Sequence, residues 1–293
     1  MTTPSPSEGQ PGEAMSRRFQ LVDVFAGERF KGNPVAVVAG GGDLSAEEML
    51  DIARWLNLSE TAFLLPPTDP AADYRVRIFT LDRELPFAGH PTLGTCHAWL
   101  ADGGKPKGEA VVQQCEAGLV PVRRTESGLA FAAPPLLRSG PVDDADLDHA
   151  LGVLGIDRSA VVEARWVDNG PGWLGLLLHS AAAVLALRPL GSWPERVDIG
   201  VVGAHPPGSA VDWELRAIFS DQHRRLVEDP ITGSLNASVA QWLIGSGRAG
   251  VRYTAAQGTA IGRVGRIAVE QDPAGTIWIG GNTETLFSGQ AGF

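Results

Sequence analysis

The chain has 293 residues, of which 44% are hydrophobic and 20% charged, the composition of a globular protein with a full core. Its formal net charge is −10 and its Lys and Arg residues gather only in pairs, which argues against nucleic-acid binding. No apolar run is long enough to span a membrane. Cys96 and Cys115 are too few for a disulfide framework or a metal site, so we expect a reduced cytoplasmic protein.

The N-terminal segment divides into a tail and the start of a folded domain. Residues 1–18 are rich in Pro, Ser, Gly and Glu, which predicts a disordered tail. Alternation over 19–25 and an apolar run over 35–38, separated by a Gly-Asn-Pro turn, predict two strands. Residues 44–56 predict an amphipathic helix, with Ser45 as its N-cap and Glu48 placed for a capping box.

Glu60 stands where the chain enters an apolar strand that ends at Pro66-Pro67. A glutamate in an apolar site has its charged form disfavoured, so it can hold or exchange a proton near neutral pH. The alternative is a solvated glutamate at a corner between a helix and a strand. The local sequence alone favours that alternative, because glutamate is seldom buried.

The chain is organised around residues 84–94, a glycine loop that leads directly into a helix. Pro91 suits the first helical position, because it needs no N–H partner there, and Gly103-Gly104 ends the helix. The helix therefore points its free backbone N–H groups and its positive dipole end at Gly89 and His90. Such a place binds a carboxylate or another anion.

The same loop occurs a second time at residues 228–236, which align with 84–92 without a gap. Glu84 falls on Glu228, Gly89 on Gly233 and His90 on Ser234. Each loop follows an apolar strand, and the ends of these strands, 77–80 and 217–220, are also related. The repeat indicates two similar halves whose helix N-termini face one cleft. A chance match in a chain rich in Pro and Gly is the alternative.

The remaining segments complete an α+β pattern. Ala133-Pro134-Pro135 is the best candidate domain boundary. Strands over 160–168, 173–178 and 211–219, a helix after Gly233, and strands over 253–281 are predicted beyond it. No dinucleotide-binding fingerprint or P-loop is present, so the standard nucleotide signatures are missing.

The candidate site residues allow several chemistries. His90 could carry a proton or orient a substrate, although a histidine at a helix start is often only a cap. A serine hydrolase could use Ser234, but the sequence has no GxSxG elbow. His90 and His97 lie seven residues apart without a suitably spaced carboxylate, so we expect no metal.

Taken together, these motifs resemble the PhzF-like family, the phenazine-biosynthesis-like group with the diaminopimelate-epimerase fold. The segments that carry the resemblance lie at 23–25, 32–38, 58–61, 84–94 and 228–234. The resemblance implies two similar α+β domains related by pseudo-two-fold symmetry, each a curled mixed sheet around a central helix. We expect the first over 19–133, joined by the last residues near 283–293, and the second over 134–282.

The resemblance also implies a cofactor-free isomerase, commonly a homodimer, that acts on a small carboxylated metabolite. In the phenazine branch the substrate is trans-2,3-dihydro-3-hydroxyanthranilate, and a glutamate moves the proton. The residues that match the family's functional positions are Glu60, His90 and Asp229 as catalytic groups and Gly89, Gly233 and Ser234 as substrate-binding groups. The family usually has small alanines where this chain has Ile231 and Leu235, which predicts an altered pocket.

Two other functions stay open. An amino-acid epimerase or racemase of this fold would use two cysteines, yet neither Cys96 nor Cys115 lies at the mouth of a glycine loop. A metabolite-binding relative without turnover would keep the fold and bind a substrate analogue, but would exchange no proton.

Overall fold

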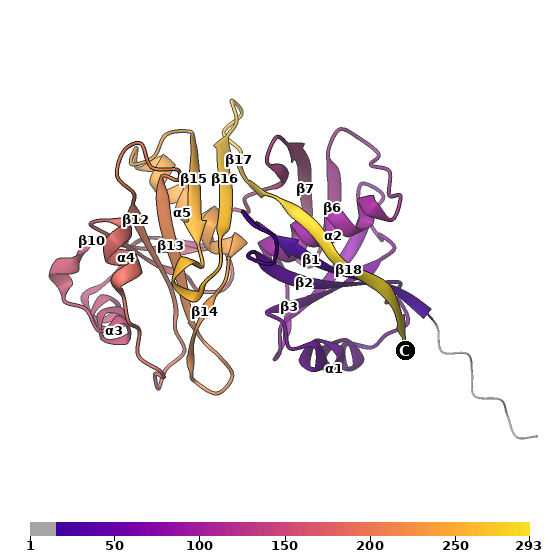
Figure 1. The fold of residues 1–293 in the computed structure, drawn as a ribbon, viewed down its shortest axis with the longest axis horizontal. Helices are drawn as coiled ribbons and strands as arrows, with labels where there is room; N and C mark the ends of the chain where they lie inside the picture. The colour runs from indigo at the N-terminus through magenta and orange to yellow at the C-terminus, as the bar shows by residue number, and fades with distance from the viewer. Residues whose placement is uncertain (1–15) are drawn as a thin grey trace, which may run out of the picture.

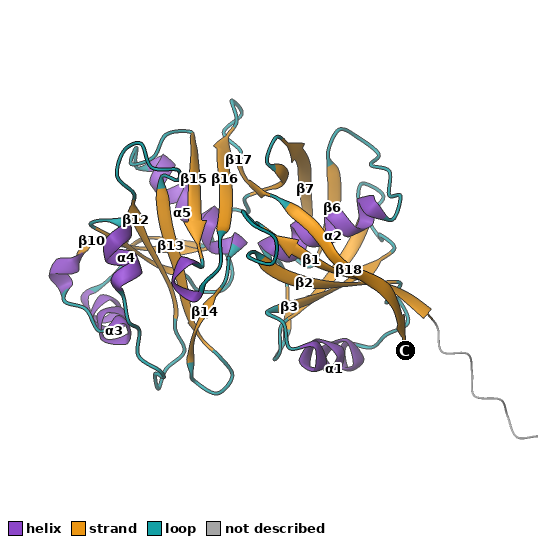
Figure 2. Ribbon diagram, viewed as in Figure 1, coloured by secondary structure: helices purple, strands orange, loops and turns teal. Residues whose placement is uncertain are grey.

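The computed structural model describes residues 16–293 and is dominated by β-strands, with few helices (Figure 2). Residues 1–15 of the predicted tail lie outside the described residues. The tail prediction is wrong for Ser16, Arg17 and Arg18, because they begin the first strand and pair with Gly292, Ala291 and Gln290. Across residues 16–293, no helix is both long and apolar enough to cross a membrane.

The first half of the chain forms one lobe of the molecule (Figure 1). Its elements, in chain order, are β1 Ser16–Val24, β2 Asn33–Ala39, α1 Ala46–Leu56, β3 Glu60–Leu65, β4 Tyr74–Phe79, β5 Glu84–Leu85, α2 Gly89–Ala101, β6 Val111–Cys115, β7 Gly118–Thr125 and β8 Gly128–Ala132. The predicted capping box of α1 is confirmed: the Glu48 N–H donates to Ser45 Oγ, and Glu48 Oε2 accepts the Ser45 N–H.

The second half forms the other lobe, apart from its last strand β18, which lies along the first lobe (Figure 1). Its elements are β9 Arg138–Pro141, α3 Asp144–Leu154, the short 3-10 helix Arg158–Ala160, β10 Val161–Asp168, β11 Leu174–Leu178, α4 Ala181–Ala186, β12 Asp198–Ala204, β13 Trp213–Ser220, β14 Leu226–Asp229, α5 Gly233–Gly245, β15 Arg252–Gln257, a second 3-10 turn Thr259–Ile261, β16 Gly265–Gln271, β17 Ile277–Gly281 and β18 Thr283–Gly292.

The two lobes pair their strands in the same order and the same directions. In the first, β1–β2 is antiparallel, β2–β3 parallel, β3–β4 antiparallel, β4–β6 parallel, and β6–β7–β8 antiparallel. In the second, β10–β11, β11–β12, β12–β13, β13–β15 and β15–β16–β17 repeat this pattern. The expected fold class is therefore confirmed: two similar α+β domains, each with a mixed sheet and a central helix.

The domains also exchange strands. The chain leaves β8 and forms β9, which pairs with β10 of the second domain. It leaves β17 and forms β18, which returns to pair with β1 of the first (Figure 1). Strands β8 and β17 pair directly with each other. One continuous set of strand pairs therefore runs through the whole described chain.

Helices α2 and α5 lie at the centres of the two domains because their sequences allow burial on every side. Neither contains an Asp, Glu, Lys or Arg, and most residues of both are buried. Small residues let the sheet approach closely: an added Cβ at Gly94 of α2 would lie 2.3 Å from Val35 of β2. The sheets thus hold both helices rigidly, and with them the glycine loops at their N-termini.

Strand pairing corrects one detail of the sequence repeat. Leu85 pairs with Ile78, and Asp229 pairs with Ala217, so Ile78 corresponds to Ala217. Arg77 therefore corresponds to Arg216, one residue earlier than the sequence match of 77–80 with 217–220 suggested. Each arginine forms an ion pair with the glutamate of its own loop, Arg77 with Glu84 and Arg216 with Glu228.

Candidate active site

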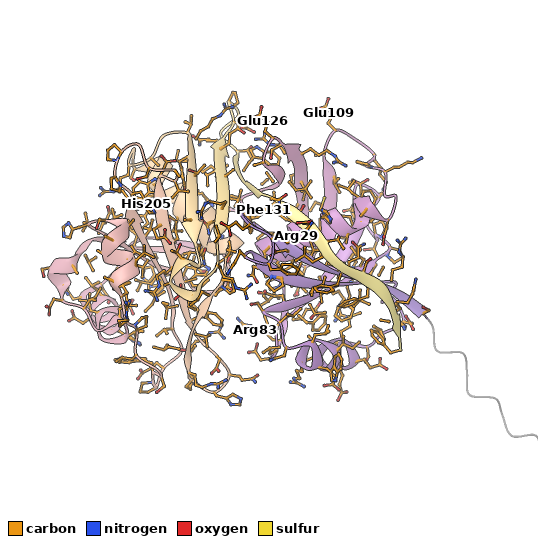
Figure 3. The ribbon with its side chains drawn as sticks, in the orientation of Figure 1. Arg29, Arg83, Glu109, Glu126, Phe131 and His205 are labelled. Carbon is orange, nitrogen blue, oxygen red and sulfur yellow. The ribbon has the colours of Figure 1, made fainter. Side chains whose placement is uncertain are left out.

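The N-termini of α2 and α5 meet in direct backbone contact. A Cβ added at Gly89 would lie 2.7 Å from Gly233 Cα, and one added at Gly233 would lie 2.7 Å from Gly89 Cα. The Cβ added at Gly89 would also lie 2.8 Å from Cζ of Phe131, which Figure 3 labels at the junction of the two domains. Only glycine fits at either position, and no side chain caps either helix. Two positive helix ends therefore converge on one place, as the repeat predicted.

The residues after the two glycines, His90 and Ser234, are both buried. The pKa of His90 is lowered from 6.5 to about 3, because burial disfavours the charged ring more than a hydrogen bond to the Pro34 carbonyl favours it. His90 is therefore neutral at physiological pH. Ser234 Oγ accepts a 3.1 Å hydrogen bond from the Trp173 indole, so its own hydrogen stays available to donate.

Glu60 is the first residue of β3, and its side chain keeps 16% exposure. Its Oε2 lies 3.4 Å from His90 Nε2. Burial raises the pKa of Glu60 well above 4.5, and the nearby charge of Asp229 raises it further. The solvated-corner alternative therefore does not describe this glutamate, which lies in a largely buried setting where a carboxyl can hold a proton.

Asp229 ends β14 of the other domain, and its charge acts on Glu60. It accepts hydrogen bonds from Thr232 Oγ1 at 2.5 Å, Asn33 Nδ2 at 3.3 Å and Ser59 Oγ at 3.4 Å. Its pKa is raised from 3.8 to about 6, chiefly by burial, and these hydrogen bonds oppose the rise. The structure thus brings all six predicted site residues to one junction.

Several residues at this junction were not singled out from the sequence. Asn33 and Ser59 stand in the motifs that carry the family resemblance, and Thr232 stands in the second glycine loop. Gln257 Oε1 accepts the Thr232 N–H at 3.0 Å and an Asn236 amide hydrogen at 2.8 Å. The place of Asn33, Ser59 and Thr232 in those motifs was the sequence signal that could have identified them. Gln257 had no such signal, because it reaches the loop from a strand distant in sequence.

The prediction that Ile231 and Leu235 reshape the pocket finds no support in their positions. Both side chains are fully buried. The side chain of Ile231 packs against Gly265, in the space that a Cβ on this glycine would need. The side chain of Leu235 packs against Gly200 in the same way. The two glycines thus make room inside the second domain for these larger residues.

The cysteines lie away from the helix N-termini. Cys96 is seven positions past Gly89 along α2 and is fully buried, and Cys115 ends β6. Burial raises the pKa of Cys96 to about 12 and raises that of Cys115 as well. Neither thiol has the exposure or the acidity of a reactive cysteine. Within residues 16–293, no group of His, Cys, Asp and Glu side chains has the arrangement of a metal site.

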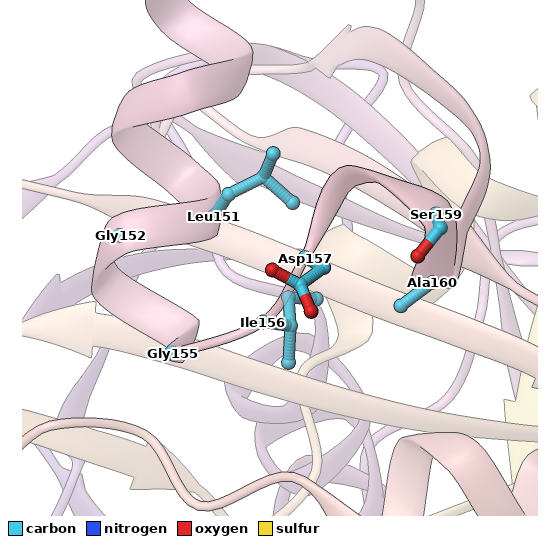
Figure 4. A pocket seen from close by; sticks show the side chains of 7 residues that line it. All are labelled: Leu151, Gly152, Gly155, Ile156, Asp157, Ser159 and Ala160. Carbon is cyan, nitrogen blue, oxygen red and sulfur yellow. The ribbon is translucent and has the colours of Figure 1, made fainter.

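A separate hollow of about 580 Å³ opens on the second domain, between the end of α3 and the following turn (Figure 4). Its lining residues are Leu151, Gly152, Gly155, Ile156, Asp157, Ser159 and Ala160. It contains one carboxylate and no histidine or basic group, and it lies at the C-terminal end of α3, whose partial negative charge disfavours an anionic substrate. The junction of α2 and α5 is therefore the candidate active site.

Comparison with known proteins shows what this chain is similar to. The family model described as phenazine biosynthesis-like protein, PhzC-PhzF, matches residues 22–291. The chain is 34% identical to antisense-enhancing sequence 1 of Schizosaccharomyces pombe, over 93% of this chain and 98% of that protein. It is 32% identical to trans-2,3-dihydro-3-hydroxyanthranilate isomerase of Pseudomonas aeruginosa, over 94% and 99%.

A solved structure of a PhzF-family phenazine biosynthesis protein from Enterococcus faecalis superposes with a TM-score of 0.75 at 27% identity. The match covers 94% of this chain and 99% of the other. The family match thus extends over nearly all the described residues, both glycine loops included. The chain belongs to the PhzC-PhzF family of phenazine biosynthesis-like proteins.

Proposed function

We propose that this isomerase moves a proton between two carbons of a small carboxylated metabolite, with Glu60 as the general acid and base and without a cofactor. The observation that carries the proposal is the setting of Glu60. This mostly buried acid has a raised pKa and lies beside two helix N-termini that can receive an anion. A carboxyl that binds a proton tightly becomes, once ionised, a stronger base than an ordinary carboxylate.

The proton balance of the acid pair supports this role. Asp229 accepts hydrogen bonds from three donors, whereas Glu60 has only the 3.4 Å approach of His90. Donors of this kind stabilise the charged form of an acid. When the pair holds one proton, that proton therefore lies on Glu60 and not on Asp229.

The proposed reaction starts from the form of the site in which Glu60 has lost its resting proton to solvent. Ionised Glu60 then takes a proton from one substrate carbon as the C–H bond breaks. The electron pair shifts along the substrate, and Glu60 returns the proton to a second carbon. The N–H groups at Gly89, Gly233 and Ser234 bind the carboxylate of the substrate. Neutral His90 and anionic Asp229 orient and polarise it. Atoms and charge balance without an oxidant or a reductant.

The Pseudomonas aeruginosa relative suggests the first substrate to test. That protein is named for trans-2,3-dihydro-3-hydroxyanthranilate, which bears the carboxylate that this site would receive. We also propose, from the family resemblance, that the chain works as a homodimer in the cytoplasm. The buried, weakly acidic thiols favour this carboxylate isomerase over a cysteine-dependent epimerase. The non-catalytic alternative predicts binding without exchange.

Solvent-deuterium uptake into the candidate substrate tests the role of Glu60. The variant Glu60→Gln keeps the shape of the side chain and removes the acid, so uptake should fall by at least ~10²-fold. Glu47→Gln, an exposed glutamate on α1, is the matched control and should behave as the parent does. Exchange at the parent rate in Glu60→Gln would remove Glu60 from the mechanism.

A further inference from the structure

Asn33 is fully buried at the start of β2, where the two domains meet. Its Nδ2 donates to the Ile231 carbonyl at 2.9 Å and to Asp229 Oδ1 at 3.3 Å, both in the second domain. The same nitrogen lies 3.3 Å from His90 Nδ1 in its own domain. One side-chain amide thus touches the loop, the carboxylate and the imidazole of the candidate site.

The orientation of this amide follows from its neighbours. A carbonyl and a carboxylate oxygen can only accept, so the nitrogen of Asn33 must face them, and a flipped amide would place oxygen against oxygen. The loop before Asn33 also forms backbone hydrogen bonds with the second domain. Gly27 N donates to Val264 O at 2.8 Å, and Val264 N donates to Lys31 O at 2.9 Å. Arg29, labelled near this junction in Figure 3, forms an ion pair with Glu284 of β18 on its own side of the junction.

The three donors to Asp229 are not equivalent. The hydroxyls of Thr232 and Ser59 can turn and accept a hydrogen bond from a protonated carboxyl. The Asn33 nitrogen can only donate. Asn33 therefore opposes protonation of the oxygen that it contacts more strictly than either hydroxyl does. The other titratable groups nearby are Glu60, neutral His90 and Glu228, and Glu228 is ion-paired with Arg216.

We propose that Asn33 is a positioning residue that keeps Asp229 anionic across the domain junction and thereby leaves the shared proton of the acid pair on Glu60. The inference rests on the proposed function, because it concerns which of the two acids of the candidate site holds the proton before the reaction starts. It gives Asn33 a role that acts through Asp229, without contact to the substrate.

Carboxyl ¹³C NMR titration tests the inference without a substrate. The Asp229 and Glu60 signals are assigned by their loss in Asp229→Asn and Glu60→Gln. In Asn33→Ala the titration midpoint of Asp229 should rise by about one pH unit, since a charge-assisted hydrogen bond is lost, and that of Glu60 should fall. Asn33→Ser, a milder change that also offers a hydroxyl in place of the amide, should shift both midpoints in the same directions.

Asn282→Ala is the matched control, because Asn282 is exposed near the same junction and makes no contact with Asp229 in the described structure. It should leave both midpoints in place. Unchanged midpoints in a folded Asn33→Ala or Asn33→Ser protein would overturn the inference. The titration reports on Asn33 even if Glu60→Gln retains deuterium exchange, so the two proposals can fail separately.

Discussion

Replacing Gly89 with alanine tests the contact between the two helix N-termini. The new Cβ would lie 2.7 Å from Gly233 Cα and 2.8 Å from Phe131 Cζ, whereas carbon atoms in contact prefer about 3.5–4.0 Å. The helices or the ring must therefore move by about 1 Å. Overpacking of this kind costs about 1–3 kcal/mol, which lowers the melting temperature of a chain of this size by roughly 2–12 °C. A 1 Å displacement at a reacting centre lowers the rate by about 10²-fold.

Gly245→Ala is the matched control, because Gly245 is an exposed helical residue at the end of α5 with open space around it. Alanine there should stabilise the protein by up to about 1 kcal/mol and leave activity unchanged. Melting curves and deuterium exchange on both variants give the comparison. If Gly89→Ala matched the parent in melting temperature and exchange, the close contact with Gly233 would be wrong.

Two further predictions concern the acid pair and the thiols. Burial raises the pKa of Asp229 from 3.8 to about 6, so this residue favours folding below about pH 4, and its contribution is lost as the pH rises through about 6. The effect of Asp229→Asn on the free energy of unfolding should therefore be more favourable at pH 8 than at pH 4, by up to about 3 kcal/mol. Urea denaturation at the two pH values measures this difference, and an effect of Asp229→Asn that does not depend on pH would contradict the prediction. Treatment with iodoacetamide should leave deuterium exchange intact, because Cys96 and Cys115 are buried and weakly acidic. Loss of exchange when either cysteine is alkylated would favour the epimerase alternative.

Local sequence predicted the features that depend on local chemistry. The capping box of Ser45 and Glu48 and the helix that starts at Gly89 were readable because their signals lie within a few residues. The repeat of 84–92 in 228–236 predicted that two helix N-termini would meet. That meeting is observed in the contact of Gly89 with Gly233.

Features that depend on partners distant in sequence were not predicted. Nothing beside Asn33 in the sequence marks Asp229 as its neighbour, because 196 positions separate them. Ile231 was interpreted as a pocket residue because the glycine that makes room for it, Gly265, comes from another strand. The tail prediction failed at Ser16 for the same reason, since its strand partner is Gly292. The correspondence of Arg216 with Arg77 likewise became visible only from the pairing of β13 with β14.

The return of β18 to β1 has a consequence for how the protein is made. Strand β1 is synthesised before the other described strands, and it finds one of its two neighbours only when the ten residues of β18 have been made. Domains usually fold in order as they emerge, but here the N-terminal lobe must wait with an unpaired edge that invites aggregation. Nascent chains stalled before Thr283 should therefore depend on chaperones more than the released protein does.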